Sequence, residues 1–268
     1  MQGKKSSLVT ILELIIITSA SYLPSNIITS YSSAFTLKWF YNTDFGISFS
    51  SPCIMNLEQD NEKEIVFGSD NGKIYCLNSY GKEKWTYLTN GDIKSLPIVA
   101  DLNSDGFSEI VVGSYDNYVY CLNHLDRLIW KFKTNEEILS SPCIADIDRD
   151  NKLEIMVGSY DNKLYYLNQD GLPKWSHITG NAIYSSPTIC DFDNDNCYEI
   201  VFGSDDHTLF CLDYLGLLLW SYQTNDKIWS SPAIADLEND GLNDILFGNN
   251  EGNLFCITIT GTPNSGKG

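Results

Sequence analysis

Residues 140–183 read SSPCIADIDRDNKLEIMVGSYDNKLYYLNQDGLPKWSHITGNAI, and this stretch decides the fold. It contains four short apolar runs separated by turn residues, which is typical of antiparallel strands. The strands are expected at residues 141–147, 154–159, 163–168 and 174–178. The pairs Asp-Asn at 161–162 and Asp-Gly at 170–171 predict hairpin turns, because these residues tolerate the positive φ that tight turns require.

The same pattern recurs five times in phase. Three columns of residues return every 45 positions: Pro52, Pro97, Pro142, Pro187 and Pro232; Gly68, Gly113, Gly158, Gly203 and Gly248; Trp85, Trp130, Trp175 and Trp220, which Trp39 joins with a one-residue slip. Runs such as EIVFG and KIYCLN are apolar on both faces, which predicts sheets packed on both sides. We therefore expect an all-β fold, a β-propeller of five four-stranded blades of about 45 residues.

The two ends of the repeat array predict how the ring closes. The fifth copy has no tryptophan after Gly261, whereas residues 37–41 read LKWFY and resemble a fourth strand. Pairing this N-terminal strand with the last three strands would complete the fifth blade and leave no free edge. The alternative is that the repeats are part of a larger propeller. The expected organisation is a leader over residues 1–34, the propeller over 35–261 and a disordered tail over 262–268.

Charge and the N-terminal residues bear on location and partners. The formal charge of −18, from 35 acidic and 17 basic residues, argues against nucleic acid as a partner. Lys4 and Lys5 precede an apolar run over residues 8–18 and a small-residue patch, the pattern of a secretory signal or anchor. An ordinary leader is the alternative. We expect an extracytoplasmic protein that contacts a membrane only through this segment.

The eight cysteines are expected to be thiols rather than disulfides. Cys76, Cys121, Cys211 and Cys256 occupy one repeat column. Equivalent positions on neighbouring packed sheets lie about 10 Å apart, beyond the limit of about 7 Å between Cα atoms that a disulfide spans. They are interpreted as small buried apolar residues.

Each copy has a nine-residue acidic loop between its first and second strands. Oxygen-bearing side chains stand at positions 1, 3, 5 and 9, and position 6, where a left-handed turn is expected, is Gly or Asn. The candidate ligands are Asn56, Glu58, Asp60 and Glu64 in loop 1 (56–64); Asp101, Asn103, Asp105 and Glu109 in loop 2 (101–109); Asp146, Asp148, Asp150 and Glu154 in loop 3 (146–154); Asp191, Asp193, Asp195 and Glu199 in loop 4 (191–199); Asp236, Glu238, Asp240 and Asp244 in loop 5 (236–244).

Oxygen donors without His or Cys favour Ca²⁺ over zinc or copper. The alternative is a plain Asp-rich turn that caps its own backbone. Loops 3 and 4, with four carboxylates each, are expected to bind best, and loop 1 is expected to bind worst.

These loops resemble a known repeat. The pattern D-x-[DN]-x-D-G-x-x-[DE], followed by an apolar strand ending in Gly, is similar to the FG-GAP repeats of integrin-α-type propellers. The pattern LYYLN-x-x-G-x-x-x-W resembles repeats of PQQ-like, quinoprotein-type propellers. Together the resemblances cover about residues 37–261. They imply Ca²⁺ in the loops, blade architecture and an adhesion or scaffolding role, although the rings of both families usually have more blades.

The sequence argues against an enzyme. A quinone-dependent oxidoreductase is the main alternative, but such enzymes are much longer and place a disulfide of adjacent cysteines beside the cofactor, and no two cysteines are adjacent here. Acids that recur identically in every blade suit structural metal better than one unique catalytic pair. The end of the chain, GTPNSGKG at 261–268, resembles the start of a phosphate-binding loop but lacks its final Ser or Thr.

One column departs from the repeat. Three residues before each strand-one proline stand Phe49, Lys94, Leu139, Tyr184 and Trp229. This column varies, is rich in aromatic residues and is expected at the rim away from the acidic loops. We interpret it as the face that binds a protein or glycan partner, with varied local packing as the alternative.

Overall fold

The structure, a computed structural model, describes residues 36–192 and 197–258. It divides into a unit that ends at Phe40 and a second unit from Tyr41 onward. Within the described residues the regular structure consists of strands alone, and no helix there could span a membrane. The predicted leader (1–34) and tail (262–268) lie outside the described residues.

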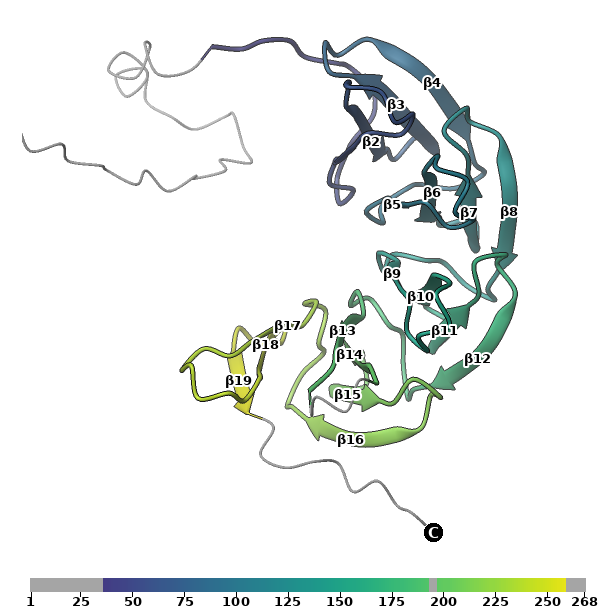
Figure 1. Cartoon of the computed structure of the whole chain (residues 1–268). Helices are drawn as coiled ribbons and strands as arrows, with labels where there is room; N and C mark the ends of the chain where they lie inside the picture. The colour runs from purple at the N-terminus through teal and green to yellow at the C-terminus, as the bar shows by residue number, and fades with distance from the viewer. Residues whose placement is uncertain (1–35, 193–196, 259–268) are drawn as a thin grey trace, which may run out of the picture. The chain divides into compact units, whose positions relative to one another are not determined.

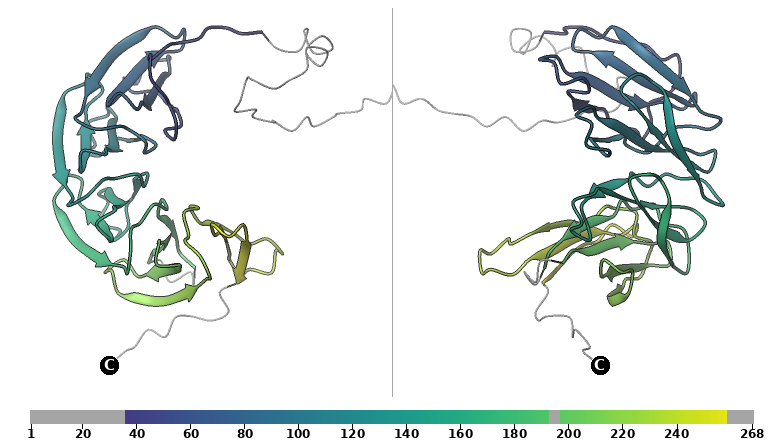
Figure 2. Two further views of the ribbon diagram at one scale, coloured as in Figure 1. Left: turned by 180° about the vertical axis from the view of Figure 1, so that it is seen from behind. Right: turned by 45° about the vertical axis from the view of Figure 1, so that its right-hand side comes forward.

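Among the described residues of the second unit, five antiparallel sheets follow one another, and within each sheet the strands pair in chain order (Figures 1 and 2). Blade 1 comprises β1 (Cys53–Met55), β2 (Glu64–Gly68), β3 (Lys73–Asn78) and β4 (Glu83–Leu88); blade 2 comprises β5 (Ile98–Ala100), β6 (Glu109–Gly113), β7 (Tyr118–Leu122) and β8 (Leu128–Lys133); blade 3 comprises β9 (Cys143–Ala145), β10 (Glu154–Gly158), β11 (Lys163–Leu167) and β12 (Pro173–Ile178); blade 4 comprises β13 (Thr188–Cys190), β14 (Glu199–Gly203), β15 (Thr208–Leu212) and β16 (Leu218–Gln223); blade 5 comprises β17 (Ala233–Ala235), β18 (Asp244–Gly248) and β19 (Leu254–Thr258). The all-β prediction is confirmed, and the four-stranded blade is confirmed for blades 1 to 4.

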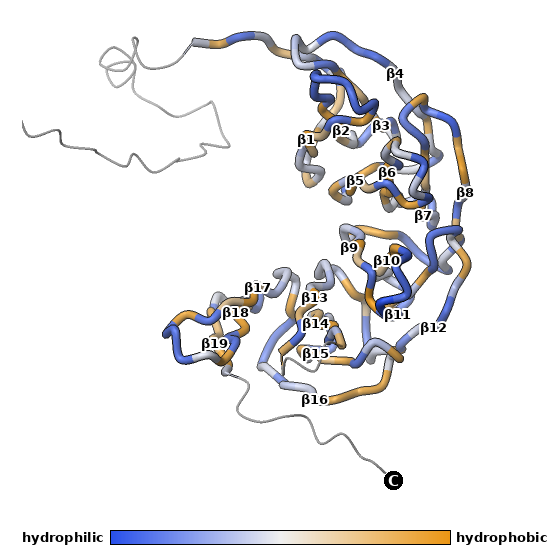
Figure 3. The backbone as a smooth tube through the Cα atoms, in the orientation of Figure 1, coloured by the Kyte–Doolittle hydropathy of each residue, from blue (hydrophilic) through white to orange (hydrophobic). Residues whose placement is uncertain are grey.

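The middle strands form the core, as their two-sided apolar character predicts. Every residue of β6, β10 and β14 is buried. Apolar clusters join each blade to the next; one of them contains Val66 and Ile74 of blade 1 with Val112 and Tyr120 of blade 2. In Figure 3 hydrophobic stretches recur in every sheet and are separated by hydrophilic turns. Burial of both faces explains why these strands do not alternate polar and apolar residues.

The tryptophan column ties neighbouring blades together. Trp130 Nε1 donates a hydrogen bond to the carbonyl of Gln169, in the turn before strand four of the next blade, at 2.9 Å. Its ring lies against Gly171, where an added Cβ would come within 2.5 Å of the indole. Gly171 also has a φ of 74°, so both close approach and backbone conformation require glycine there. Trp175 repeats the arrangement with Tyr214 and Gly216 one blade later.

The chain end differs from the closing-strand prediction. The fifth sheet has three strands, and residues 36–43 form no strand. The ring of Tyr41 packs against Phe67 and Tyr75 of blade 1, with centroid distances of 6.4 and 5.7 Å. Tyr222 of β16 packs against the equivalent residues of blade 5 in the same edge-on way. Tyr41 thus has the position that an outer strand preceding blade 1 would give it.

The cysteine prediction holds for three members of the column and fails for the fourth. Cys76, Cys121 and Cys211 are free thiols with buried side chains. Burial raises the pKa of Cys76 to about 12 and also raises the pKa values of the other two. Cys256 is free but exposed. The difference arises because β19 pairs only with β18 among the described strands, whereas the equivalent strands are covered by a fourth strand and a following blade.

Candidate metal loops and aromatic rim

The acid at position 9 has the same structural task in every loop. One oxygen of its carboxylate accepts a hydrogen bond from the backbone N–H of position 2, as Glu109 does from Leu102 at 2.9 Å and Glu154 from Ile147 at 2.9 Å. The corresponding bonds in loops 1, 4 and 5 measure 3.0, 2.8 and 3.1 Å. A buried N–H needs such a partner, so the recurrence of this acid has a structural reason that the sequence did not reveal.

Positions 1 and 5 also accept backbone hydrogen bonds. In loop 2, Asp101 Oδ2 accepts from Gly106 N at 3.0 Å, and Asp105 Oδ1 accepts from Phe107 N at 2.8 Å. The expected left-handed backbone at position 6 is present at Gly106, Asn151 and Gly241. It is absent at Asn61, where the prediction was wrong.

Loop 1 is irregular because its first residue is Asn56, whose side chain has an NH2 group where an aspartate has its second acceptor oxygen. This amide donates to the carbonyl of Asp60. Position 4 is left-handed as well in loops 1, 2, 3 and 5, a feature that sequence reasoning missed.

Loop 3 brings three of its four predicted ligands together. Asp146, Asp148 and Glu154 offer oxygens within 4.8 Å of one another. Asp150 instead accepts a hydrogen bond from Lys152 N at 2.8 Å. Among the described residues this is the one acidic cluster of three with that geometry.

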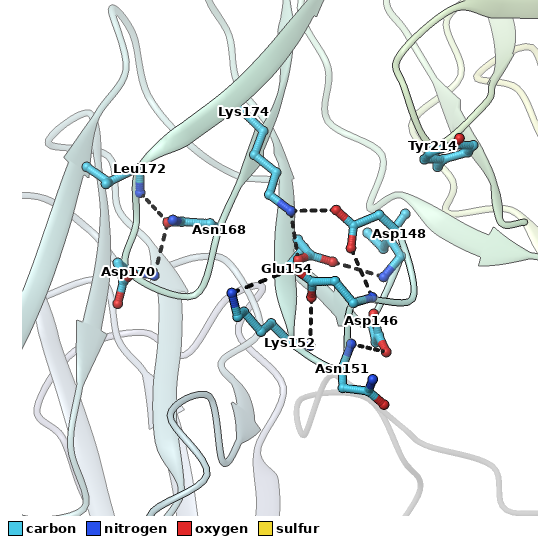
Figure 4. A network of polar contacts seen from close by, with 12 residues as sticks. Asp146, Asp148, Asn151, Lys152, Glu154, Asn168, Asp170, Leu172, Lys174 and Tyr214 are labelled. Atoms are coloured by element: carbon cyan, nitrogen blue, oxygen red, sulfur yellow. Dashed lines mark hydrogen bonds and ion pairs between the residues drawn. The ribbon is translucent and has the colours of Figure 1, made fainter.

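The centre of loop 3 contains an ammonium group. Lys174 of β12 donates to Asp148 Oδ2 at 2.7 Å and to Glu154 Oε1 at 3.0 Å (Figure 4). Both carboxylates raise the pKa of Lys174, outweighing the opposing effect of its burial. Loop 1 has the same arrangement: Lys84 of β4 contacts Glu58 Oε1 at 2.6 Å and Glu64 Oε1 at 3.0 Å.

Loop 2 has no lysine at the equivalent place. The residue there is Ile129 of β8, and the Asn103 amide donates to Asp105 Oδ2 at 3.1 Å and to Glu109 Oε1 at 3.4 Å. Glu109 is 2% exposed, and this burial raises the pKa of its carboxyl group, with Asp105 and Asp101 adding to the effect. In loop 2 the neutral Asn103 amide thus contacts two carboxylates, whereas a lysine ammonium group does so in loops 1 and 3. In loop 4, Asp193 and Asp195 lie outside the described residues.

A ladder of aromatic rings crosses three blades at the opposite end of the strands from the loops. We call Tyr115, Tyr160, Tyr184 and Trp229 the aromatic rim. Tyr184 and Trp229 stack with centroids 4.8 Å apart and planes at 18°. Tyr160 lies 4.3 Å from Tyr184, and its hydroxyl is 3.2 Å from that of Tyr115. Trp229 is 46% exposed.

Charged groups fix both ends of the aromatic rim. The buried carboxylate of Asp205 accepts a hydrogen bond from Trp229 Nε1 at 2.6 Å and pairs with Lys227 at 2.8 Å. At the other end the Lys94 ammonium lies 4.5 Å from the centroid of Tyr115 and 6.0 Å from that of Phe49. The predicted column thus contributes Tyr184 and Trp229 to the ladder itself, and Lys94 flanks it.

Sequence reasoning missed Tyr115 and Tyr160. They follow the serine that recurs after strand two in blades 1 to 4, and the same column holds Asp70, Asp205 and Asn250. Variation in this second column was the available signal. A cavity of about 640 Å³ lies against blade 1 beside Tyr41 and involves none of the predicted site residues.

Comparison with known proteins supports a β-propeller repeat fold. Residues 90–187 match the lambda-carrageenase β-propeller domain family. The structure of BamB from Moraxella catarrhalis is similar, with a TM-score of 0.59 and 16% identity, covering 82% of this chain and 61% of that chain. A structure of BBS1N in complex with ARL6DN, soaked with mercury, has a TM-score of 0.58 and 15% identity, covering 80% of this chain and 67% of that chain; the lead-soaked form has 0.55 and 13%, covering 76% and 59%. This chain therefore spans about three fifths of the BamB structure's length. No curated protein sequence matches.

Proposed function

We propose that this chain is a non-enzymatic propeller module that binds a protein or glycan partner through the aromatic rim and holds Ca²⁺ in its oxygen-lined loops. The observation that carries the proposal is the exposed, immobilised indole of Trp229. Stacking on Tyr184 and the bond to Asp205 fix its orientation. An aromatic side chain that is already ordered loses little entropy when a partner covers it, which is characteristic of binding hot spots.

The net charge of the chain limits the kinds of partner that it can bind. A net charge of −18 favours neutral or basic ligands and disfavours nucleic acid. The BBS1N propeller is described in complex with a protein, which supports a protein partner for this chain over a glycan. An extracytoplasmic location, through the N-terminal segment, belongs to the same proposal. Quinone with Ca²⁺ is expected to give no dye-linked alcohol oxidation.

The role of Ca²⁺ is structural in this proposal. Resemblance to FG-GAP repeats and the oxygen-only donors of loop 2 support it. A ligand that binds only the native state contributes about 2.7 kcal/mol per site at a hundredfold excess over Kd. Ca²⁺ thereby offsets the repulsion between the negatively charged carboxylates that lie close together in the loops.

We also infer that residues 37–41 supply the fourth strand of blade 5. The place of Tyr41 before blade 1 supports this inference. Leu254 of β19 is 76% exposed, while its counterparts Leu164 and Leu209 are fully buried, and an uncovered apolar strand edge invites aggregation. Supplying the missing strand removes that edge.

The experiment on the binding face compares Trp229→Ala with wild type on a glycan array and a displayed peptide library. Binders of the wild type should lose about 2 kcal/mol with Trp229→Ala, about thirtyfold in Kd, while its thermal melt is unchanged. Trp220→Ala, at the tryptophan position that recurs in blades 1 to 4, is the contrast and should lower stability instead. Binders that retain their affinity for Trp229→Ala, or the absence of any binder, would contradict the proposed face.

A further inference from the structure

In blades 1, 2 and 3 the fourth strand contains one residue that lies at the acidic loop of the same blade. In blade 3 the pairing of β11 with β12 shifts between Tyr166 and Leu167, so that Lys174 is an extra residue opposite this step. A bulge of this kind re-aims a side chain. The shift occurs at the same repeat position in blades 1, 2 and 4. The bulged residues are Lys84, Ile129, Lys174 and Leu219.

Lysine and aliphatic residues alternate at this position, and the loops differ accordingly. Lys174 lies within hydrogen-bonding distance of both Asp148 and Glu154, and the side chain of Glu154 is only 1% exposed. Lys84 makes the same pair of contacts in loop 1, where Glu64 has no exposed side-chain surface. A buried carboxylate needs a counter-charge, and in these two loops the chain supplies it.

Loop 2 offers the complementary case. Ile129 lines a small cavity of about 50 Å³ together with Asn103 and Glu109. In blade 3 a different cavity, about 90 Å³, is lined by Lys174 and Glu154. An aliphatic side chain brings no charge to Glu109, so the same fold position is apolar in blade 2 and cationic in blade 3.

We propose that Lys84 and Lys174 are the built-in cations of loops 1 and 3, and that among loops 1–3 a divalent cation binds only in loop 2. The inference rests on the proposed function, in which the oxygen-lined loops bind Ca²⁺. An ammonium group that already occupies two carboxylates repels a second cation and uses the oxygens that would bind it. Loop 3, which has the most carboxylates and was expected to bind strongly, is therefore closed to Ca²⁺.

The repeat itself provides the substitutions that test this. Lys174→Leu copies the residue of blade 4, Lys84→Leu does the same in blade 1, and Ile129→Lys copies blade 3 into blade 2. The measurement is the number of Ca²⁺ ions bound per chain, by equilibrium dialysis with Ca²⁺ alone. Each lysine variant should bind one ion more than wild type, and Ile129→Lys should bind one fewer. Lys174→Leu should also melt lower than wild type in EDTA and recover when Ca²⁺ is added.

The outcomes separate this inference from the proposed function. If wild type binds Ca²⁺ and the lysine variants gain none, the inference is overturned while metal binding stands. If wild type binds none and Lys174→Leu binds one, the role of the lysine as built-in cation stands, while Ca²⁺ binding by loop 2 and by the other unmodified loops is refuted. If neither binds, both are overturned. Should the lysine variants fail to fold even with Ca²⁺, Ile129→Lys decides: loss of one ion supports the inference and an unchanged number overturns it.

Discussion

Adding one methyl group to Gly158, the last residue of β10, tests how tightly this end of the strand is packed. A Cβ at this position would lie 2.3 Å from Cγ2 of Ile183, 2.9 Å from its Cβ and 3.0 Å from its carbonyl oxygen. A branched Cβ and a backbone carbonyl cannot rotate away, so β10 or the following connection must move. Overpacking typically costs about 1–3 kcal/mol, and we expect Gly158→Ala to cost about 3 kcal/mol. For a chain of this size this lowers Tm by about 6–12 °C.

The fifth blade supplies the matched control. At Gly248 an added Cβ would have no neighbour closer than 3.6 Å among the described residues. Gly248→Ala should therefore leave Tm nearly unchanged. The Tm of both variants is measured by scanning calorimetry with Ca²⁺ present. Combining Gly158→Ala with Ile183→Ala should destabilise by less than the sum of the two single changes, because the second change makes room for the first. Equal melting of Gly158→Ala and Gly248→Ala would refute the packing argument.

Three further predictions test other parts of the molecule. Burial lowers the pKa of His177, outweighing its hydrogen bond to Gly216. As the pH falls, the unfolded chain takes up the proton before the folded chain does, so stability should fall as pH drops below about 6.5. His177→Phe, which copies blade 2, should reduce the change in the urea unfolding midpoint between pH 7.5 and 5. Ca²⁺ should raise Tm over that in EDTA by about 5–10 °C for one saturated site, and an identical melt would leave the loops as turns. If the ring closes, Cys256 should resist a thiol reagent in the native chain as the buried Cys211 does, and deletion of residues 36–40 should make Cys256 reactive while Cys211 stays protected.

The sequence predicted the parts of the fold that local chemistry determines. Apolar runs and turn residues located the middle strands to within one residue, because burial on both faces and positive φ at Asn162 and Gly171 leave direct marks on the sequence. The first strand of each blade is shorter than expected. In blade 3 it spans Cys143–Ala145 rather than residues 141–147, because Pro142 cannot donate to a ladder and Asp146 already belongs to the loop.

The candidate sites were predicted less completely, because they depend on register and on contacts between blades. The bulge that aims Lys174 at Glu154 follows from a pairing shift that no spacing rule reveals. Likewise, Tyr115 and Tyr160 join the aromatic rim only because residues 45 apart touch where blades meet. Sequence columns identify equivalent positions, but they do not say which different columns meet in space.

Deviations from the repeat are the most informative residues in this molecule, for a physical reason. Equivalent positions in successive blades have nearly the same backbone and neighbours, so packing alone would select nearly the same residue at each. The glycines beside isoleucine and the tryptophans beside the next turn obey this rule. Two positions depart from this rule. The bulge position holds lysine in some blades and isoleucine in another, and the rim column holds tryptophan in one blade and leucine in another. Differences at otherwise equal positions must come from what lies outside the shared blade framework. Our two proposals assign the first difference to the charge of a loop and the second to a surface that binds a partner.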